Sequence, residues 1–335
     1  MPEDQQRPAH PLEAMRAERR ADAGDHSCDP LEYMDELSNA GRWGADDRLG
    51  TLNYITPEVR AAAAAVVRDG IAVGCSFEIG ASSPMNRHGG MQRFMSMMPK
   101  DFGPRARAAE IAETVIMSTH GGWVTHVDAP NHLFWDGTTY NDISDSTVTG
   151  FGGAPVGDIA AIPDGVITRG VLLDVAALHG VDCLERGHGV TPEELEEAEA
   201  RQGVTVRSGD VVLLRTGDGG RYRAAHAEHR TISFADGMAG WHPRCMPWLH
   251  EREVALMAID AGQDPNPSGF EWCKINAGVH FIALTRMGLW MMDWCNLEEL
   301  SATCAELGRS EFLLSIGTLR LAACSATPVQ PVALF

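Results

Sequence analysis

Four side chains that can bind a metal ion lie within thirteen residues of the sequence. Histidine makes up only 13 of the 335 residues, so three histidines in one short segment are a local excess. Imidazole nitrogen and carboxylate oxygen, without thiolate, are donors suited to a divalent ion such as Zn²⁺ or Mn²⁺. The segment MSTHGGWVTHVDAPNHLFWDG therefore indicates a metal site, and its candidate ligands are His120, His126, Asp128 and His132.

The spacing separates two direct ligands from a more distant histidine. If THVDA is extended, His126 and Asp128 point to the same side of the strand and Val127 points into the core. Their Cα atoms are then about 6–7 Å apart, so both side chains can reach one ion. A straight strand would carry His132 roughly 20 Å away, but Pro130 ends regular pairing and lets the chain bend back. We expect His132 to be either a ligand of a second metal ion or a proton carrier.

Other polar residues near apolar runs have less specific surroundings. Asp260 ends the run EVALMAID, where α/β proteins place site residues, although an ordinary turn aspartate is equally consistent with this position. Arg215 and Asp218 follow another apolar run and favour a structural ion pair. The sequence places no base beside Cys273 or Cys295, so we interpret them as buried, unreactive thiols.

Apolar runs alternate with amphipathic segments along the chain. Strands are predicted where β-branched and apolar residues cluster between turn residues, in GVLLDVAAL, GDVVLLRTG, EVALMAID and SEFLLSIGTLRLA. Capping residues and following glycines predict helices over 57–69, 192–202 and 297–307, with Thr56, Thr191 and Asn296 as N-caps. A further short helix in VHFIALTRMG should stop at Gly288. Alternating strands and helices predict an α/β fold that positions the site.

Length, charge and cysteine spacing exclude several classes of protein. The chain has room for one large domain and shows no repeat or linker, so we expect a polar N-terminal arm over 1–40 and one domain over 41–335. The arm is either disordered or wrapped on a partner subunit. The net charge of −19 argues against nucleic acid or a membrane as partner.

The apolar runs and the cysteines also indicate the cellular compartment in which we expect the protein. No apolar run is long enough to span a bilayer, and the N-terminus lacks the apolar core of a secretory signal. The eight cysteines are scattered without a CxxC pair. This pattern favours reduced thiols, and we expect a cytoplasmic protein.

The sequence resembles the metal-dependent cyclase superfamily, in its large bacterial subgroup. THVDAPNH matches the end of the family signature HxGTHxDxPxH, and LFWDGTTYND matches the tail that follows it. GRWGADDRLGTLNYITPE, GDVVLLRTG and VHFIALTRMGLWMMDWCNLEEL are similar to further blocks of that subgroup. The matches run in the family's order from about residue 41 to 325. The family includes kynurenine formamidases, isatin hydrolases and proteins described as polyketide cyclases.

The resemblance implies a role for each residue that aligns with a functional position of the family. His280 matches the distal histidine of the family, and Asp293 stands where the family usually has glutamate. The family's first histidine falls on Gly122, and the HGGWVTH loop offers His120 instead, because glycines permit the chain to bulge. The implied metal ligands are His120, His126, Asp128, His132 and Asp293. The implied catalytic residues are His132 and His280.

The resemblance also implies a fold and an activity. The fold is a swivelling β/β/α arrangement, a single domain with a mixed sheet core and peripheral helices. The activity is metal-dependent hydrolysis of a C–N bond in an amide, formamide or lactam by activated water, as in arylformamidases. The alternatives are metal-dependent cyclisation or dehydration of a secondary metabolite, and non-catalytic binding of a small molecule. Family members are homodimers or homotetramers, which implies a homo-oligomer.

Four tryptophans lie beside the proposed ligands in the sequence. Tryptophan is usually a core residue, but ligand pockets are also enriched in aromatic side chains. The residues that we expect to form the wall of a pocket for an apolar or aromatic substrate are Trp123, Trp135, Trp290 and Trp294.

Overall fold

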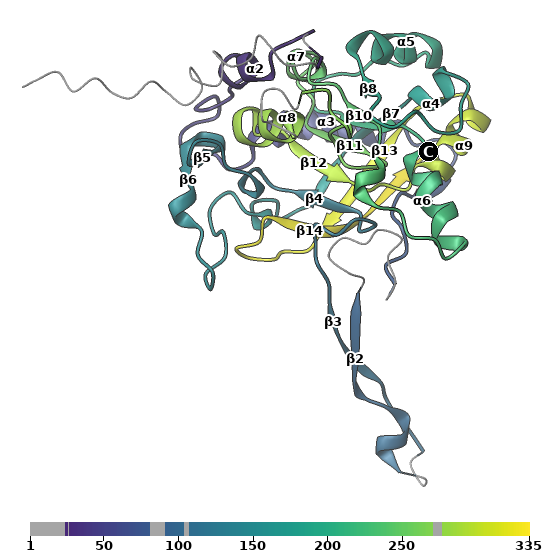
Figure 1. Cartoon of the computed structure of the whole chain (residues 1–335). Helices are drawn as coiled ribbons and strands as arrows, with labels where there is room; N and C mark the ends of the chain where they lie inside the picture. The colour runs from purple at the N-terminus through teal and green to yellow at the C-terminus, as the bar shows by residue number, and fades with distance from the viewer. Residues whose placement is uncertain (1–23, 26, 81–90, 104–106, 271–276) are drawn as a thin grey trace, which may run out of the picture.

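A closed ring of seven strands forms the centre of the computed structural model, which describes residues 24–25, 27–80, 91–103, 107–270 and 277–335. The strand order is β14-β13-β7-β9-β11-β12-β4, and the ring closes because β4 pairs with both β12 and β14. The run β7-β9-β11-β12 is parallel, and the other pairings are antiparallel. The α/β class with a mixed sheet core and peripheral helices is therefore confirmed (Figure 1).

The strands differ widely in length. The ring consists of β4 (His126–Asp128), β7 (Val166–Asp174), β9 (Val211–Arg215), β11 (Leu256–Ile259), β12 (Trp290–Asp293), β13 (Glu311–Thr318) and β14 (Ala326–Leu334). β1 (Ala72–Gly74) pairs with the end of β14. Short strands outside the ring are β2 (Gln92–Met97), β3 (Ala112–Ile116), β5 (Thr138–Thr139), β6 (Ile143–Ser144), β8 (Gly189–Val190) and β10 (Gly240–Trp241).

Helices surround the ring. The α-helices are α2 (Pro30–Glu36), α3 (Pro57–Ala64), α4 (Val175–Leu178), α5 (Pro192–Gln202), α6 (Asp218–Ala227), α7 (Cys245–Glu251), α8 (Gly278–Phe281) and α9 (Glu298–Leu307). A π-helical segment, η9 (Ile282–Met287), continues α8. Short 3₁₀ turns are η1 (Gly50–Tyr54), η2 (Pro99–Phe102), η3 (Pro130–His132), η4 (Tyr140–Asp142), η5 (Asp145–Thr147), η6 (Ile159–Ala161) and η7 (Phe234–Asp236). None of the helices in the described part of the chain is both long and apolar enough to cross a bilayer.

The parallel strands are buried on both faces, which explains their continuous apolar sequences. In β9, Val212 and Leu214 join the core beneath the helices, whereas Val211 and Leu213 join a second core to which all seven ring strands contribute. Strands covered on both sides read as unbroken Val and Leu runs rather than as alternating patterns. β12 has the same two-sided packing, with Met291 in the first core and Met292 in the second, and β4 pairs with it. These two strands carry the site.

Most predicted elements are present, with changes at their ends. Thr56 and Thr191 cap α3 and α5 as expected, but α3 ends at Ala64, well before Gly70. The segment GVLLDVAAL is strand β7 only as far as Asp174 and then turns into α4. The predicted cap at Asn296 is wrong, because Leu297 is the N-cap of α9 and makes no side-chain capping bond.

Gly288 stops the predicted helix over 279–288 for two reasons. Its φ of +59° lies in the left-handed region that favours glycine. A Cβ there would also lie 2.6 Å from the Tyr140 ring. The glycine therefore ends η9 and lets the chain turn directly into β12.

The N-terminal boundary differs from the expectation of an arm over 1–40. Residues 1–23 and 26 lie outside the described residues. Helix α2, however, packs Leu31 and Met34 into the main core with at most 2% of each exposed. Asp29 caps this helix through a bond from the Leu31 amide. The packed chain thus begins before residue 41, because α2 has an apolar face that contacts α8 and η9.

Strands β2 and β3 form a hairpin that projects away from the body (Figure 1). They pair only with each other and take no part in the ring. Large apolar side chains on it are exposed, among them Phe94 at 56%, Ile111 at 62% and Ile116 at 55%.

The cysteines within the described residues, seven of the eight, are free thiols. Burial raises the pKa of Cys295 well above its usual value, in line with the expected unreactive thiol. Cys273 lies outside the described residues. The cytoplasmic location stays a prediction.

Candidate metal centre and its cavity

Strand β4 presents two donors on one face, as the sequence predicts. His126 Nε2 lies 3.6 Å from Asp128 Oδ1, while Val127 between them is completely buried in the opposite core. β4 pairs with β12 so that His126 stands opposite Asp293. Residues paired across strands share a face of the sheet, so the three side chains point the same way.

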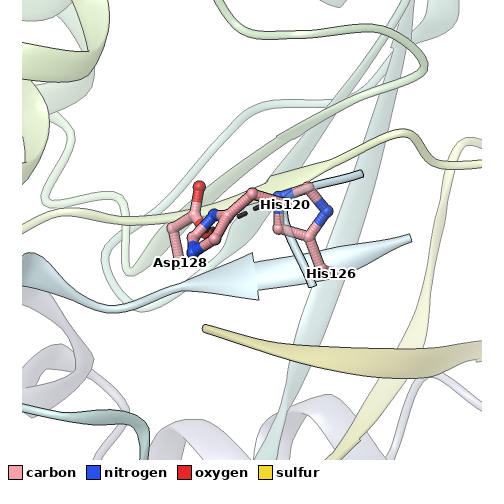
Figure 2. Close-up of side chains that lie close together, drawn as sticks. All are labelled: His120, His126 and Asp128. Carbon is pink, nitrogen blue, oxygen red and sulfur yellow. Dashed lines mark ion pairs between the residues drawn. The ribbon is translucent and has the colours of Figure 1, made fainter. Parts of the chain in front are cut away.

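His120 joins this pair from the loop before β4. Its Nδ1 lies 3.1 Å from Asp128 Oδ1, and Figure 2 shows the side chains of His120, His126 and Asp128 gathered together. The donor atoms of the three residues all lie within 4.8 Å of one another. The chain between the two histidines turns at Gly121, whose amide bonds to the Ser118 carbonyl. The HGGWVTH loop thus brings His120 beside His126 and Asp128, and its role as the family's first histidine stays a prediction.

The second nitrogen of each imidazole has a partner that fixes the ring. His126 Nδ1 lies 2.7 Å from the Val124 carbonyl oxygen, which leaves Nε2 as the nitrogen that faces Asp128. His120 Nε2 lies 3.3 Å from Ser325 Oγ, which leaves its Nδ1 toward the same carboxylate. Partners of this kind orient metal-binding histidines and set which nitrogen can coordinate.

A second group of donors shares Asp128 with the first. Asp128, His280 and Asp293 also have donor atoms within 4.8 Å of one another. His280 Nδ1 lies 2.5 Å from Asp264 Oδ2, and its Nε2 lies 3.7 Å from Asp293 Oδ2. Burial by itself would lower the pKa of His280, but its hydrogen bonds to Asp264 and Asp293 raise it well above the usual value. Asp128 therefore lies between two sets of ligand-type side chains.

The surroundings of Asp128 fit a cation. Burial opposes its ionisation, but the imidazoles of His126, His132 and His120 hold its pKa well below the usual range. Although His120 Nδ1 and Asp128 Oδ1 approach each other, neither buried atom has a hydrogen-bond partner among the described residues. A buried carboxylate oxygen that lacks a hydrogen bond is unfavourable, and a divalent ion bound there would satisfy it. The donor set of nitrogen and carboxylate oxygen suits Zn²⁺ or Mn²⁺.

His132 returns to the site because the chain bends at Pro130. The turn η3 begins at this proline, and the His132 ring stacks on His120 with centroids 4.0 Å apart. Its atoms belong to neither three-residue group. Burial, together with the nearby His120, His280 and His126, lowers the pKa of His132 to about 4, although Asp128 opposes this shift. The bend is thus as expected, and the choice between ligand and proton carrier stays open.

A cavity of about 510 Å³ opens onto these residues. Its lining combines the polar side chains of the candidate ligands with the apolar side chains of Leu133, Phe234, Met238 and Trp294. Of the four tryptophans expected to form the substrate wall, Trp294 lines this cavity. Trp123 stacks on Phe77, the partly buried Trp135 packs on Phe281, and Trp290 is completely buried. These three rings are not among the residues that line the cavity.

The remaining candidates near strand ends are structural. Asp260 is completely buried and accepts hydrogen bonds from the Thr216 amide at 2.9 Å and the Gly217 amide at 2.8 Å. It therefore holds the turn after β9 and does not line the cavity. Arg215 and Asp218 are both in ion pairs, but not with each other. Arg215 pairs with Asp174 and Glu298, and Asp218 pairs with Arg221.

Three site residues were not predicted from the sequence. Asp264 and Gln263 follow β11, and the Gln263 amide nitrogen lies 2.5 Å from Asp293 Oδ1. Ser325 precedes β14 and supports His120. The polar run QDPN beyond the apolar strand EVALMAID was the available signal, because the carboxyl ends of parallel strands carry site residues.

The fold and the site together define a class of α/β proteins with a closed mixed sheet and a buried His/Asp centre. The family model described as putative cyclase matches residues 49–263, more than half of the chain. The chain therefore belongs to this cyclase family.

Solved structures are similar over most of their length. A crystal structure described as a novel cyclase is 26% identical, with a TM-score of 0.78, and the match covers 89% of this chain and 100% of that one. An isatin hydrolase bound to the product analogue thioisatinate is 17% identical, with a TM-score of 0.57 and coverage of 79% and 92%. Isatin hydrolase A from Labrenzia aggregata, bound to benzyl benzoate, is 19% identical, with a TM-score of 0.57 and coverage of 82% and 96%. No curated protein matches the sequence.

Proposed function

We propose that the protein is a metal-dependent hydrolase that cleaves the C–N bond of an amide, formamide or lactam. The observation that carries this proposal is the pair of donor groups that share Asp128 at the wall of the cavity. A proton-donating histidine stands beside them, as hydrolysis of a C–N bond requires. The fold shared with the isatin hydrolases supports the same reaction class.

The first group, His120, His126 and Asp128, would hold the ion, and Asp293 would offer a donor for a second position beside it. A divalent ion held there supplies Lewis acidity, which polarises a carbonyl group and lowers the pKa of water. Zn²⁺ or Mn²⁺ fits the donors. Gln263 orients Asp293 through its amide nitrogen.

His280 and His132 divide the proton transfers. The raised pKa of His280 keeps it protonated near neutral pH, so it can donate a proton to the leaving nitrogen. His132, whose pKa is lowered to about 4 chiefly by burial, is neutral there and can accept a proton from the attacking water. The water oxygen then joins the carbonyl carbon as the C–N bond breaks.

The substrate that suits the cavity is small and apolar or aromatic. Trp294, Phe234, Met238 and Leu133 supply apolar surface to the cavity that the candidate metal ligands also line. A volume of about 510 Å³ accommodates a ring compound with its scissile group toward Asp128.

The test combines elemental analysis with a screen of formamides, lactams and lactones. His126→Ala and Asp128→Ala should each lose both bound metal and turnover. His229→Asn, at an exposed position outside the cavity, is the matched control and should retain both. Unchanged metal content and turnover in the two site variants would contradict the proposal. Incorporation of oxygen from labelled water into product identifies hydrolysis, whereas turnover without incorporation favours metal-assisted cyclisation.

We also propose that the chain forms a homodimer or homotetramer. The support is the projecting hairpin, whose exposed Phe94, Ile111 and Ile116 form apolar surface of the kind found at protein interfaces.

A further inference from the structure

We propose that His179, His188 and Glu194 form a second metal site, on the surface and separate from the central one, for a divalent transition-metal ion such as Zn²⁺. None of the three residues lines the central cavity. Their donor atoms nevertheless all lie within 4.8 Å of one another, as closely grouped as those of the central groups.

Both imidazoles are aimed at a single carboxylate oxygen. His179 Nε2 lies 2.6 Å from Glu194 Oε1, and His188 Nε2 lies 2.9 Å from the same atom. The two rings are 5.7 Å apart and inclined at 70°. Zinc takes histidine nitrogens at about 2.0–2.1 Å and carboxylate oxygens at about 2.0–2.2 Å, so small side-chain movements would seat an ion between the three donors. Two histidines and a glutamate are also a donor set that zinc enzymes use.

The backbone holds each of the three residues in place. His179 is the C-cap of α4, and its amide bonds to the Val175 carbonyl. His188 lies in a turn just before β8, and its carbonyl accepts the Gly240 amide at 3.0 Å. The donors are therefore brought together by hydrogen-bonded elements rather than by long, free side chains.

Glu194 lies in the first turn of α5 and uses its two oxygens differently. Oε2 accepts the Thr191 amide at 2.8 Å and completes the capping box of the helix. The capping box accounts for a glutamate at this position, but it does not require either histidine. Both rings hydrogen-bond the other oxygen, so three donors of the types that zinc uses are already gathered at one point, and an ion would replace these two hydrogen bonds.

The exposure of His179 and the types of donor atom indicate which ions this site would bind. The His179 side chain is 42% exposed, so an ion here exchanges with solvent and keeps at least one coordination position open. Imidazole donors favour Zn²⁺, Cu²⁺ or Ni²⁺ over Mg²⁺ and Ca²⁺. The ion would link α4, the turn before β8 and α5 through three ligands that lie within sixteen residues of the sequence. It would stabilise this part of the surface without taking part in the central reaction.

The test is equilibrium dialysis against Zn²⁺ followed by elemental analysis, in the His126→Ala/Asp128→Ala background and in the wild-type protein. The background should retain one equivalent of zinc. Adding His179→Asn or His188→Asn should remove it, with affinity lowered by at least about 10- to 100-fold, since even the loss of a ligand's supporting partner costs that much. Glu194→Gln should also weaken binding, while it preserves the cap because glutamine serves in a capping box.

His229→Asn is the matched control, because it makes the same chemical change at an exposed histidine outside the cluster. It should leave zinc binding unchanged, and circular dichroism should show that every variant is folded. The proposal is overturned if the background binds no zinc, or if the His179 and His188 variants bind it as tightly as the control does. Since the background lacks two central ligands, a failure here is distinct from a failure of the hydrolase proposal.

Discussion

Asp128 is the residue on which the central site depends. It is 1% exposed, it is shared by both donor groups, and the surrounding imidazoles favour its ionised form despite burial. The sequence was sufficient to predict its role with His126, because alternate residues of a strand share a face. The polar run after β11 marks Asp264 as a residue at a strand end, but its contact with His280 depends on how two distant segments pack and could not be predicted.

We expect Asp264→Asn to lower both the pKa of His280 and the rate of catalysis. Asparagine keeps the size of the side chain but removes one of the two carboxylates that raise the pKa of His280. Loss of such a supporting partner typically costs about 10- to 100-fold in activity. NMR titration of the His280 ring and measurement of kcat check the two effects. Asp142→Asn, at an exposed residue with a φ of +56° that asparagine tolerates, is the control, and equal behaviour of both variants would contradict the assignment.

Trp294 and Trp290 should respond differently to substitution by leucine. Trp294 lines the cavity, so Trp294→Leu should lower kcat/KM for the best substrate of the screen by about 10-fold or more. Trp290 is completely buried and donates to the Leu49 carbonyl at 2.7 Å. Trp290→Leu should lower the free energy of unfolding by roughly 2–3 kcal/mol. Steady-state kinetics and urea unfolding distinguish these outcomes, and a purely structural effect of both substitutions would remove Trp294 from the substrate wall.

At the scale of elements, the sequence predicted the helices and strands whose formation depends on residues close together in the chain. α5 has its capping box and following glycine, and β9 has an unbroken apolar run, so both were found. β14 was not found, because Pro328 and Pro331 each remove an amide that a strand normally uses. It forms because the neighbouring β13 and the distant strands β4 and β1 all pair with it, and the two distant partners are not evident from the local sequence. The ring closure that places β4 beside β12 could not be predicted for the same reason.

The segment before α2 is tied to the body by an ion pair that should make stability depend on pH. Asp25 Oδ2 lies 2.9 Å from Nε2 of the buried His242. Burial of Asp25 opposes ionisation, but hydrogen bonds from His242 and Ser27 lower its pKa from 3.8 to about 2. Because the folded-state pKa lies below that of the unfolded chain, the stabilisation is present above about pH 4 and is lost as the pH falls toward 2.

Asp25→Asn should therefore destabilise the protein at pH 7 and less so at pH 3. Since the Asp25 side chain is 39% exposed, solvent screening limits the effect to below about 1 kcal/mol. Urea unfolding of both proteins at the two pH values measures it, with the surface variant Glu36→Gln as control. A difference that stays constant between pH 7 and pH 3 would exclude the pair as its source.

At the scale of the whole molecule, one closed ring supports the centre, and the hairpin stands outside it (Figure 1). Because the ring is closed, β4 and β12 each pair with a neighbouring strand on both sides. This pairing fixes the positions of the ligands that the two strands carry. The hairpin has no such support. Its two strands pair only with each other, and an isolated two-stranded hairpin is marginally stable in water.

A second copy of the chain would supply the missing contacts. The cross-strand register places Phe94 opposite Thr114 and Gln92 opposite Ile116, so Phe94 and Ile116 lie on the same face of the hairpin. Phe94 and Ile116 are each more than half exposed, which is costly unless a partner covers them. Homo-oligomers bury surfaces of this kind through symmetric contacts. The hairpin is therefore the part of the chain where substitution should alter assembly without altering the centre.

We expect Phe94→Thr combined with Ile116→Thr to lower the molar mass in solution from that of a dimer or tetramer toward that of the 36.2 kDa chain. Threonine keeps the preference for strand while removing most of the apolar surface. Sedimentation equilibrium measures the mass, and bound metal should stay unchanged because neither residue lines the cavity. Glu113→Gln, on the same hairpin, is the control and should leave the mass as in the wild type. A wild-type protein that is already monomeric, or a double variant of undiminished mass, would show that the exposed hairpin is not an interface between copies.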